Sequence, residues 1–127
     1  MDTIALAVGL RPSIELLHQA GCQIKYVREL GGHVALRDER METTVQGGIF
    51  VAGDSAGIEE ATTAMLEGKI AGIAAALKAG GVASPKWLKE IEKAQHDLEE
   101  FRSGPFGKHV IEGIKKALLP AGGDSNA

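Results

Sequence analysis

The chain has 127 residues, of which 44% are hydrophobic, which is enough for one compact domain with a core and argues against a disordered chain. Its formal net charge at pH 7 is −3 and it has no basic stripe interleaved with aromatic residues, which argues against a nucleic-acid-binding protein. Cys22 is the only cysteine, which excludes an internal disulfide, a CxxC redox pair and a cysteine-ligated iron–sulfur cluster.

The first ten residues, MDTIALAVGL, predict neither a signal peptide nor a membrane span. They carry an acid where a signal peptide is basic, and the apolar run is too short to cross a bilayer. A lone free thiol is typical of a reducing compartment. We therefore expect a soluble, cytoplasmic protein with no membrane partner.

The first half of the chain predicts strands and one short helix. Residues 3–8 form a continuous apolar run that stops at Gly9, which is typical of a strand buried on both faces. Residues 13–20 predict a short helix that Gly21 ends. Strands are expected over 22–27 and 33–37, followed by a polar connection and a buried strand over 49–52.

A long helix is predicted from residue 58 to about residue 78. Glu59 and Glu60 would lie in its first turn, where acids complement the helix dipole, and Gly80 and Gly81 would close it. Small residues recur on this helix at steps of three and four and line one stripe: Ala61, Ala64, Gly68, Ala71, Gly72 and Ala75. Two explanations stay open, an ordinary alanine-rich helix or a helix that approaches another backbone very closely.

Two further helices are predicted in the last third of the chain. The first begins at Ser84-Pro85, a cap followed by proline at the first helical position. It is expected to bury Trp87, Leu88, Ile91, Leu98 and Phe101. After a break at RSGPFG, a last helix is marked by Val110, Ile111, Ile114, Ala117 and Leu118. Residues 120–127 are expected to form a frayed tail.

Asp54 lies where the predicted strand 49–52 ends and the long helix begins. In open α/β sheets, ligands bind beyond the carboxyl ends of the strands and face helix N-termini. A carboxylate there can accept hydrogen bonds from sugar or polyol hydroxyls, and Gly53 would let a ligand approach the backbone closely. The alternative is that Asp54 only caps the helix, as Asp often does.

Three segments of the sequence, in this order and spacing, carry a family resemblance. DTIALAVGLRPSIELL, GGHVALRDERMETTVQGGIFVAGD and AGIEEATTAMLEGKIAG resemble the C-terminal part of FAD-dependent pyridine nucleotide-disulfide oxidoreductases. The resemblance covers residues 2–79 and is greatest to the thioredoxin-reductase-like set with the flavoprotein subunits of sarcosine oxidase, amino-acid dehydrogenases and hydrogen cyanide synthase. Thr44 to Asp54 fits the family's T-x-x-x-x-apolar-aromatic-apolar-apolar-G-D motif, which contacts the flavin's ribityl chain.

The resemblance implies an α/β fold, the C-terminal part of a Rossmann-like FAD-binding domain over residues 1–80, with a helical appendage over 81–119. It implies FAD as cofactor, with NAD(P)H used by the parent enzyme. The spacing of the histidines separately predicts no metal. Asp54 would bind ribityl hydroxyls, and the amides around Ile58 and Glu59 would face the pyrimidine edge of the flavin. The full set of implied FAD-binding residues is Gly53, Asp54, Gly57, Ile58, Glu59 and Ala61.

The chain contains no G-x-G, the start of the loop with which this family holds a dinucleotide pyrophosphate. We therefore interpret the chain as a C-terminal segment, incomplete alone, whose small-residue stripe associates with an N-terminal dinucleotide-binding half or with a second copy. Two alternatives are a non-catalytic interaction or dimerising module derived from this fold, and an α/β segment without independent function. Cys22 is expected to be structural, and the four histidines show no metal-ligand spacing.

Overall fold

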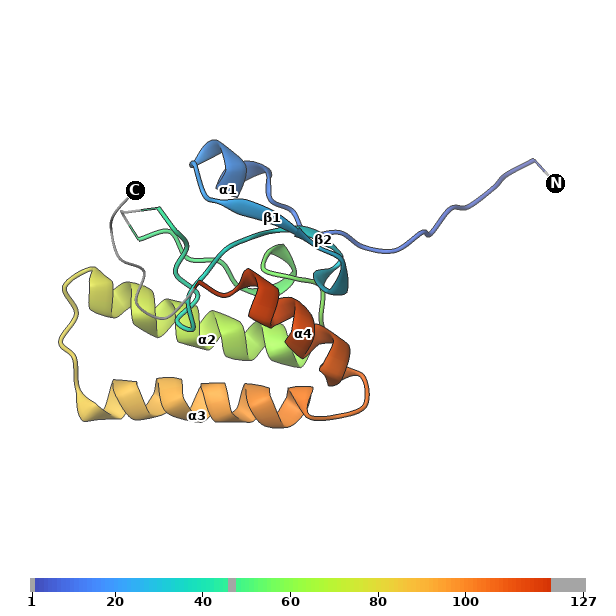
Figure 1. Cartoon of the computed structure of the whole chain (residues 1–127). Helices are drawn as coiled ribbons and strands as arrows, with labels where there is room; N and C mark the ends of the chain where they lie inside the picture. Colours follow the sequence, from blue (N-terminus) through green and yellow to red (C-terminus); the bar gives the residue numbers. More distant parts are fainter. Residues whose placement is uncertain (1, 46–47, 120–127) are drawn as a thin grey trace.

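The computed structural model describes residues 2–45 and 48–119, which combine helices with a small β-sheet (Figure 1). The strands are β1 (Ile24–Val27) and β2 (Gly32–Ala35), and the 3-10 turns are η1 (Arg28–Leu30) and η2 (Gly53–Ser55). The helices are α1 (Glu15–Gln19), α2 (Ala61–Lys78), α3 (Pro85–Arg102) and α4 (Gly107–Ala117). The chain therefore has the mixed helix and strand content that the sequence predicts.

Strands β1 and β2 form an antiparallel pair in which Ile24 lies opposite Ala35 and Val27 opposite Gly32. The turn η1 joins them, and its Leu30 is fully buried. Both predicted strands are thus confirmed, each slightly shorter than expected. Val27, Leu30 and Val34 point into one core together with Ala117 of α4.

Two other predicted strands are wrong for this structure. Residues 3–8 are extended but form no strand, and Ile4, Leu6 and Val8 are more than four-fifths exposed. Figure 1 shows this segment projecting away from the rest of the chain. Residues 49–52 make only an isolated bridge, Phe50 with Glu42. A strand needs a neighbour for its backbone hydrogen bonds, and the described residues place none beside 3–8.

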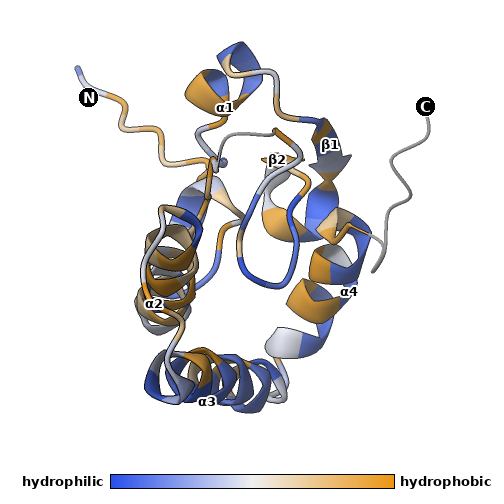
Figure 2. Cartoon of the chain, turned by 90° about the vertical axis from the view of Figure 1, so that its left-hand side faces the viewer, coloured by the Kyte–Doolittle hydropathy of each residue, from blue (hydrophilic) through white to orange (hydrophobic). Residues whose placement is uncertain are grey.

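Helices α2 and α3 pack against each other and enclose the second core (Figure 1). Its buried members are Met41, Ile70, Ala71, Ile91, Ala94 and Leu98. Figure 2 shows α2 coloured mainly hydrophobic and α3 mainly hydrophilic, so α3 contributes only one apolar stripe. The prediction that Trp87, Leu88 and Phe101 are buried is wrong, because all three are exposed.

The exposed side of α2 carries much of the predicted small-residue stripe. We call Ala61, Met65, Gly68, Gly72 and Ala76 the open face of α2, because all five are exposed. A Cβ atom added at Gly68 or at Gly72 would meet nothing within 4 Å. Ala71 of the stripe is instead buried in the core. Gly68 and Gly72 of the stripe are therefore not used to bring α2 close to another described helix.

Helix α4 lies against η1 and β1 at close range. A Cβ atom added at Gly113 would come within 2.8 Å of Glu29 Cβ and 2.9 Å of Leu30 Cγ, so only glycine fits there without a shift. After α4 the chain pairs with the end of the hairpin, since Arg37 donates its N–H to Ala117 and accepts from the Leu119 N–H. Helices α3 and α4 are thus packed on the segment that precedes residue 80, as an appendage would be. The boundary at 80 stays a prediction.

Helix α2 begins later than predicted. It starts at Ala61, and Glu60 is its N-cap residue, so neither Glu59 nor Glu60 lies in the first turn. Its end at Lys78 agrees with the prediction. The tail predicted over 120–127 lies outside the described residues. Over the ranges 2–45 and 48–119, no helix is long and apolar enough to span a bilayer.

Candidate functional site

The Gly53-Asp54 pair forms a tight turn ahead of α2. Gly53 adopts a left-handed backbone with φ of 71°, which an L side chain adopts only at a cost. Asp54 is exposed. It does not cap α2, because the N-cap position belongs to Glu60 and no side chain caps the helix. The structure thus removes the capping explanation and leaves the Asp54 carboxylate facing outward.

The backbone between the turn and α2 is partly engaged within the chain. The Gly57 N–H donates to the Asp54 carbonyl at 3.3 Å, and the Ile58 N–H donates to the Leu30 carbonyl at 3.0 Å. The first helical bond of α2 runs from the Ala64 N–H to the Glu60 carbonyl. Helical geometry leaves the amides before Ala64 without intrahelical acceptors. The amides that face a ligand most readily are therefore those from Glu59 to Thr63, rather than that of Ile58.

A hollow of about 160 Å³ lies beside the start of α2. Its lining includes Glu59 and Glu60, the end of α3 contributes Phe101 and Arg102, and the turn before α4 contributes Phe106. Phe106 is 90% exposed and Phe101 is 52% exposed, so apolar side chains on this hollow are open to solvent. The helical appendage and Glu59, one of the six predicted FAD-binding residues, therefore share one concave surface.

Four charged side chains meet beneath this surface and form what we call the buried charge cluster: Arg37, Glu59, Glu67 and Arg102. Arg37 and Glu67 are each 2% exposed. Arg102 binds Glu59 through two hydrogen bonds, Nε to Oε2 at 3.0 Å and Nη2 to Oε1 at 2.7 Å. Its Nη2 also donates to Glu67 Oε1 at 2.8 Å. Two cations and two anions therefore balance in the interior, as buried charges require.

Glu67 connects the cluster to the Gly53-Asp54 turn. Its Oε2 accepts a hydrogen bond of 2.9 Å from the Gly53 N–H, while its Oε1 lies 3.6 Å from Arg37 Nη2. Arg37 Nη1 also donates to the Ala56 carbonyl at 3.2 Å. The cluster thus holds the backbone of the turn at two points, Gly53 and Ala56.

The pKa values of the two arginines shift in opposite directions, although burial acts to lower both. Burial acts to lower the pKa of Arg102, but its hydrogen bonds and charge interactions with Glu59 and Glu67 outweigh this and raise the pKa above its ordinary value. Burial lowers the pKa of Arg37, against the attraction of Glu67. Both guanidinium groups remain charged at neutral pH, since arginine is not deprotonated in proteins.

Sequence reasoning missed Arg37, Glu67 and Arg102. One signal was available for Glu67, which lies one turn from Ala64 and from Ala71 on the helix face that turns inward. A charge on an apolar face predicts a buried partner, because an isolated buried charge is costly. The identity of that partner depends on how α3 packs, which the sequence does not indicate.

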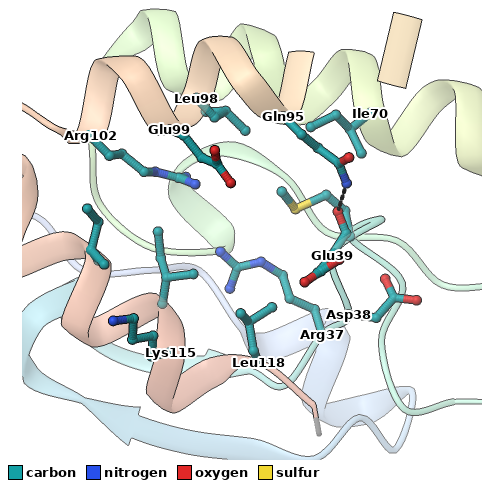
Figure 3. Close-up of a pocket in the computed structure, with 13 residues that line it drawn as sticks. Arg37, Asp38, Glu39, Ile70, Gln95, Leu98, Glu99, Arg102, Lys115 and Leu118 are labelled. Carbon is teal, nitrogen blue, oxygen red and sulfur yellow. Dashed lines mark hydrogen bonds between the residues drawn. The ribbon is translucent and has the colours of Figure 1, made fainter. Parts of the chain in front are cut away.

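A second cavity, of about 320 Å³, is lined by residues of α2, α3, α4 and the segment 37–41. Figure 3 shows it in close-up. The side chains of Arg37 and Arg102 approach it from opposite sides, and Gln95 Nε2 donates to the Glu39 carbonyl at its edge. Both guanidinium groups are already bound to Glu67. This cavity therefore does not offer its arginines to an anionic ligand.

The remaining candidate residues lie apart from the turn. Cys22 is buried and its thiol donates to Thr43 Oγ1 at 3.4 Å, in keeping with a structural role. Thr44 Oγ1 accepts from the Gln23 N–H at 3.1 Å. In the described part of the chain, one group of possible metal ligands, His96, Asp97 and Glu100, gathers on α3. His96 and Glu100 are exposed, and a small exposed group of this kind does not by itself make a metal site.

Comparison with known proteins gives one family and three relatives. The family model described as pyridine nucleotide-disulphide oxidoreductase matches residues 1–68. The A subunit of an opine oxidase from Rhizobium meliloti (strain 1021) is 27% identical over 122 residues, which is 94% of this chain and 26% of the relative. The corresponding opine oxidase protein of Agrobacterium tumefaciens (strain Ach5) is 37% identical over 73 residues, 58% of this chain and 14% of the relative.

A further opine oxidase protein of the same kind, from Rhizobium meliloti, is 35% identical over 103 residues, which is 81% of this chain and 19% of the relative. The chain thus spans between 14% and 26% of the length of these relatives. The longest match covers 94% of the chain, so it extends beyond the family model into the helices α3 and α4. No solved structure matches the chain.

Proposed function

The chain belongs to the pyridine nucleotide-disulphide oxidoreductase family, and from that premise we propose that its residues 53–61 bind part of FAD in a flavin-dependent NAD(P)H oxidoreductase. The observation that carries the proposal is the exposed Asp54 at a glycine turn directly before α2, within the region that the family model matches. Gly53, Asp54, Gly57, Ile58, Glu59 and Ala61 would form the contact set.

The residues present fit one part of FAD. An outward carboxylate at Asp54 suits the hydroxyls of the ribityl chain, and the free amides at the start of α2 suit the carbonyl and nitrogen atoms of the pyrimidine edge. Ile58 would contribute its side chain, because its amide already donates to Leu30. The hollow beside Glu59 provides a concave surface for a ring edge.

In this proposal the flavin supplies the redox chemistry, the transfer of a hydride from a nicotinamide. The residues of this chain bind and orient the flavin. The positive end of the α2 dipole, at Ala61, stabilises negative charge on the pyrimidine edge when the flavin is reduced. Asp54 fixes the ribityl chain and therefore the position of the ring.

The contact set covers only part of the cofactor. The sequence contains no G-x-G loop for the pyrophosphate, and the relatives are several times longer than this chain. We propose that an N-terminal dinucleotide-binding half completes the site and packs on the open face of α2. By likeness to the opine oxidase relatives, the complete enzyme would be one component of an oxidase that acts on an opine-like substrate.

One observation favours a second candidate function, an interaction or dimerising module derived from this fold. The open face of α2 leaves room for a backbone at Gly68 and at Gly72, as a close-packed interface requires. In this case a second copy would cover the face and flavin binding would be absent.

Titration with FAD distinguishes the two candidates. The purified chain would be titrated and the bound flavin measured by absorbance and fluorescence after desalting. Asp54→Asn removes the proposed ribityl contact, and Asp97→Asn on α3 is the matched control with the same change in charge. We expect the wild-type chain and Asp97→Asn to bind FAD equally and Asp54→Asn to bind roughly tenfold more weakly, the value of a lost hydrogen bond to a charged group.

The opposite result is equally informative. A wild-type chain that retains no flavin, yet sediments as a stable dimer, would reject FAD binding by this chain on its own and support the interaction module. Equal binding by Asp54→Asn and the wild type would show that FAD binds elsewhere on the chain.

A further inference from the structure

We infer that Arg102, which lies at the end of α3 outside the proposed FAD contacts, is the positioning residue for the flavin-binding turn. The inference rests on the proposed function and adds a residue to it. Arg102 binds Glu59, a member of the contact set, through two hydrogen bonds. Through Glu67 it also holds the Gly53 N–H, at the other end of that set.

The geometry leaves Glu67 little freedom. Its Oε1 is held by Arg102 at 2.8 Å, and its Oε2 accepts from the Gly53 N–H at 2.9 Å. The two oxygens belong to one rigid carboxylate, so a shift of Oε1 moves Oε2 and the hydrogen bond that it accepts from the Gly53 amide. Since Gly53 has the left-handed backbone that turns the chain toward Asp54, a displaced Glu67 would also displace the Asp54 carboxylate.

Charge gives Arg102 a second effect on the same site. The carboxylate of Glu59 lies beside the start of α2, where the flavin would carry negative charge in its reduced form. Arg102 neutralises Glu59 directly in a site where the side chains of both residues are only about one-tenth exposed. Without Arg102, the negative charges of Glu59 and Glu67 would exceed the single positive charge of Arg37. That excess would oppose the reduced flavin more than the oxidised flavin.

This gives the helical appendage a role in the chemistry of the site. Arg102 is the last residue of α3, and the turn that follows it lines the same hollow as Glu59. The longest match to an opine oxidase relative covers 94% of this chain, so the helices are shared with that relative beyond the end of the family model.

Four proteins test the inference: the wild type, Arg102→Met, Arg102→Met/Glu59→Gln and Arg40→Met. The double variant keeps the cluster neutral and therefore guards against misfolding of the single variant. Arg40 is exposed, and Arg40→Met is the matched control. Two readouts are taken, the hydrogen exchange of the Gly53 amide in the flavin-free chain and the dissociation constants of oxidised and reduced FAD.

For Arg102→Met we expect the Gly53 amide to exchange roughly tenfold faster, while the amides of β1 keep their rates. We expect reduced FAD to lose roughly tenfold more affinity than oxidised FAD. The double variant should recover the ratio of the two affinities but not the slow exchange of Gly53. Arg40→Met should resemble the wild type in both readouts.

Equal acceleration at Gly53 and at β1 would indicate only a loss of global stability and would overturn the inference. Unchanged affinities for both forms of FAD in Arg102→Met, with a wild type that binds FAD, would also overturn it and leave the proposed function intact. A wild type that binds no FAD would reject FAD binding by this chain on its own, and the inference with it.

Discussion

At the scale of single residues, Glu67 is the side chain on which most contacts of the site depend. It is 2% exposed and is held by two arginines and one backbone amide. Removing its charge would leave the two buried cations, Arg37 and Arg102, with Glu59 as the one remaining carboxylate of the cluster. We expect Glu67→Gln to lower the free energy of unfolding by about 3 kcal/mol, as is typical when one partner of a buried ion pair is removed.

The measurement is urea unfolding followed by circular dichroism. Glu90→Gln is the control. Glu90 of α3 pairs with Lys69 of α2 at the surface, where ion pairs contribute little to stability. A Glu67→Gln protein as stable as Glu90→Gln would mean that the cluster does not stabilise the fold.

At the residue scale, the sequence indicates the Gly53-Asp54 turn of the candidate site but does not indicate the buried residues Arg37, Glu67 and Arg102. Gly53 and Asp54 stand out because a glycine and an acid after an apolar run form a local pattern. Arg37, Glu67 and Arg102 do not, because their contacts join residues distant in the sequence. Local patterns show which side chains are unusual, but only the packing of α3 on α2 shows which of them meet.

At the scale of the elements, two glycines in helices have opposite environments. Gly113 of α4 lies against Glu29 and Leu30, whereas Gly68 of α2 faces open space. We expect Gly113→Ala to destabilise the fold by about 1 kcal/mol or more, because the added methyl group forces α4 away from η1. We expect Gly68→Ala to stabilise it by about 1 kcal/mol through helix propensity alone. Thermal unfolding of the two variants, which carry the same Gly→Ala substitution, tests this prediction. Equal shifts in melting temperature would contradict it.

Helices are easier to predict than strands in this chain, for a physical reason. The helical period and the cap at Ser84 predict α3 and the end of α2 within a few residues, since helical hydrogen bonds are local. The run 3–8 has the composition of a strand, but a strand forms only beside a partner. The run 49–52 does lie beside residues 41–43, but it pairs with them through one bridge only. The start of α2 lies later than the sequence predicts, because the amides of Gly57 and Ile58 bond to Asp54 and Leu30 before the helix begins.

At the scale of the whole molecule, apolar surface is left uncovered on the N-terminal segment and on the open face of α2. We expect the chain to self-associate in a concentration-dependent way when no other partner is present. Gly68→Lys should weaken this association, since it places a charged side chain on the open face without a clash inside the fold. Sedimentation velocity over a range of concentrations measures the effect.

Glu92→Lys, on the exposed side of α3, is the control for that experiment. Association that is equally strong in Gly68→Lys and Glu92→Lys would place the interface away from α2. A wild type that stays monomeric at every concentration would mean that the open face needs a different chain to cover it.

The backbone pairing of Arg37 with the end of α4 and with Leu119 also has a consequence for the order of folding. The backbone of Arg37 bonds to Ala117 and Leu119, and its side chain bonds to Glu67 and to Ala56. On the ribosome, the hairpin and α2 emerge long before Leu119, and loop closure between residues so distant in sequence costs entropy. We therefore expect the turn at Gly53 to reach its final shape late in synthesis, after Arg102 has bound Glu59 and Glu67 and α4 has packed against the hairpin.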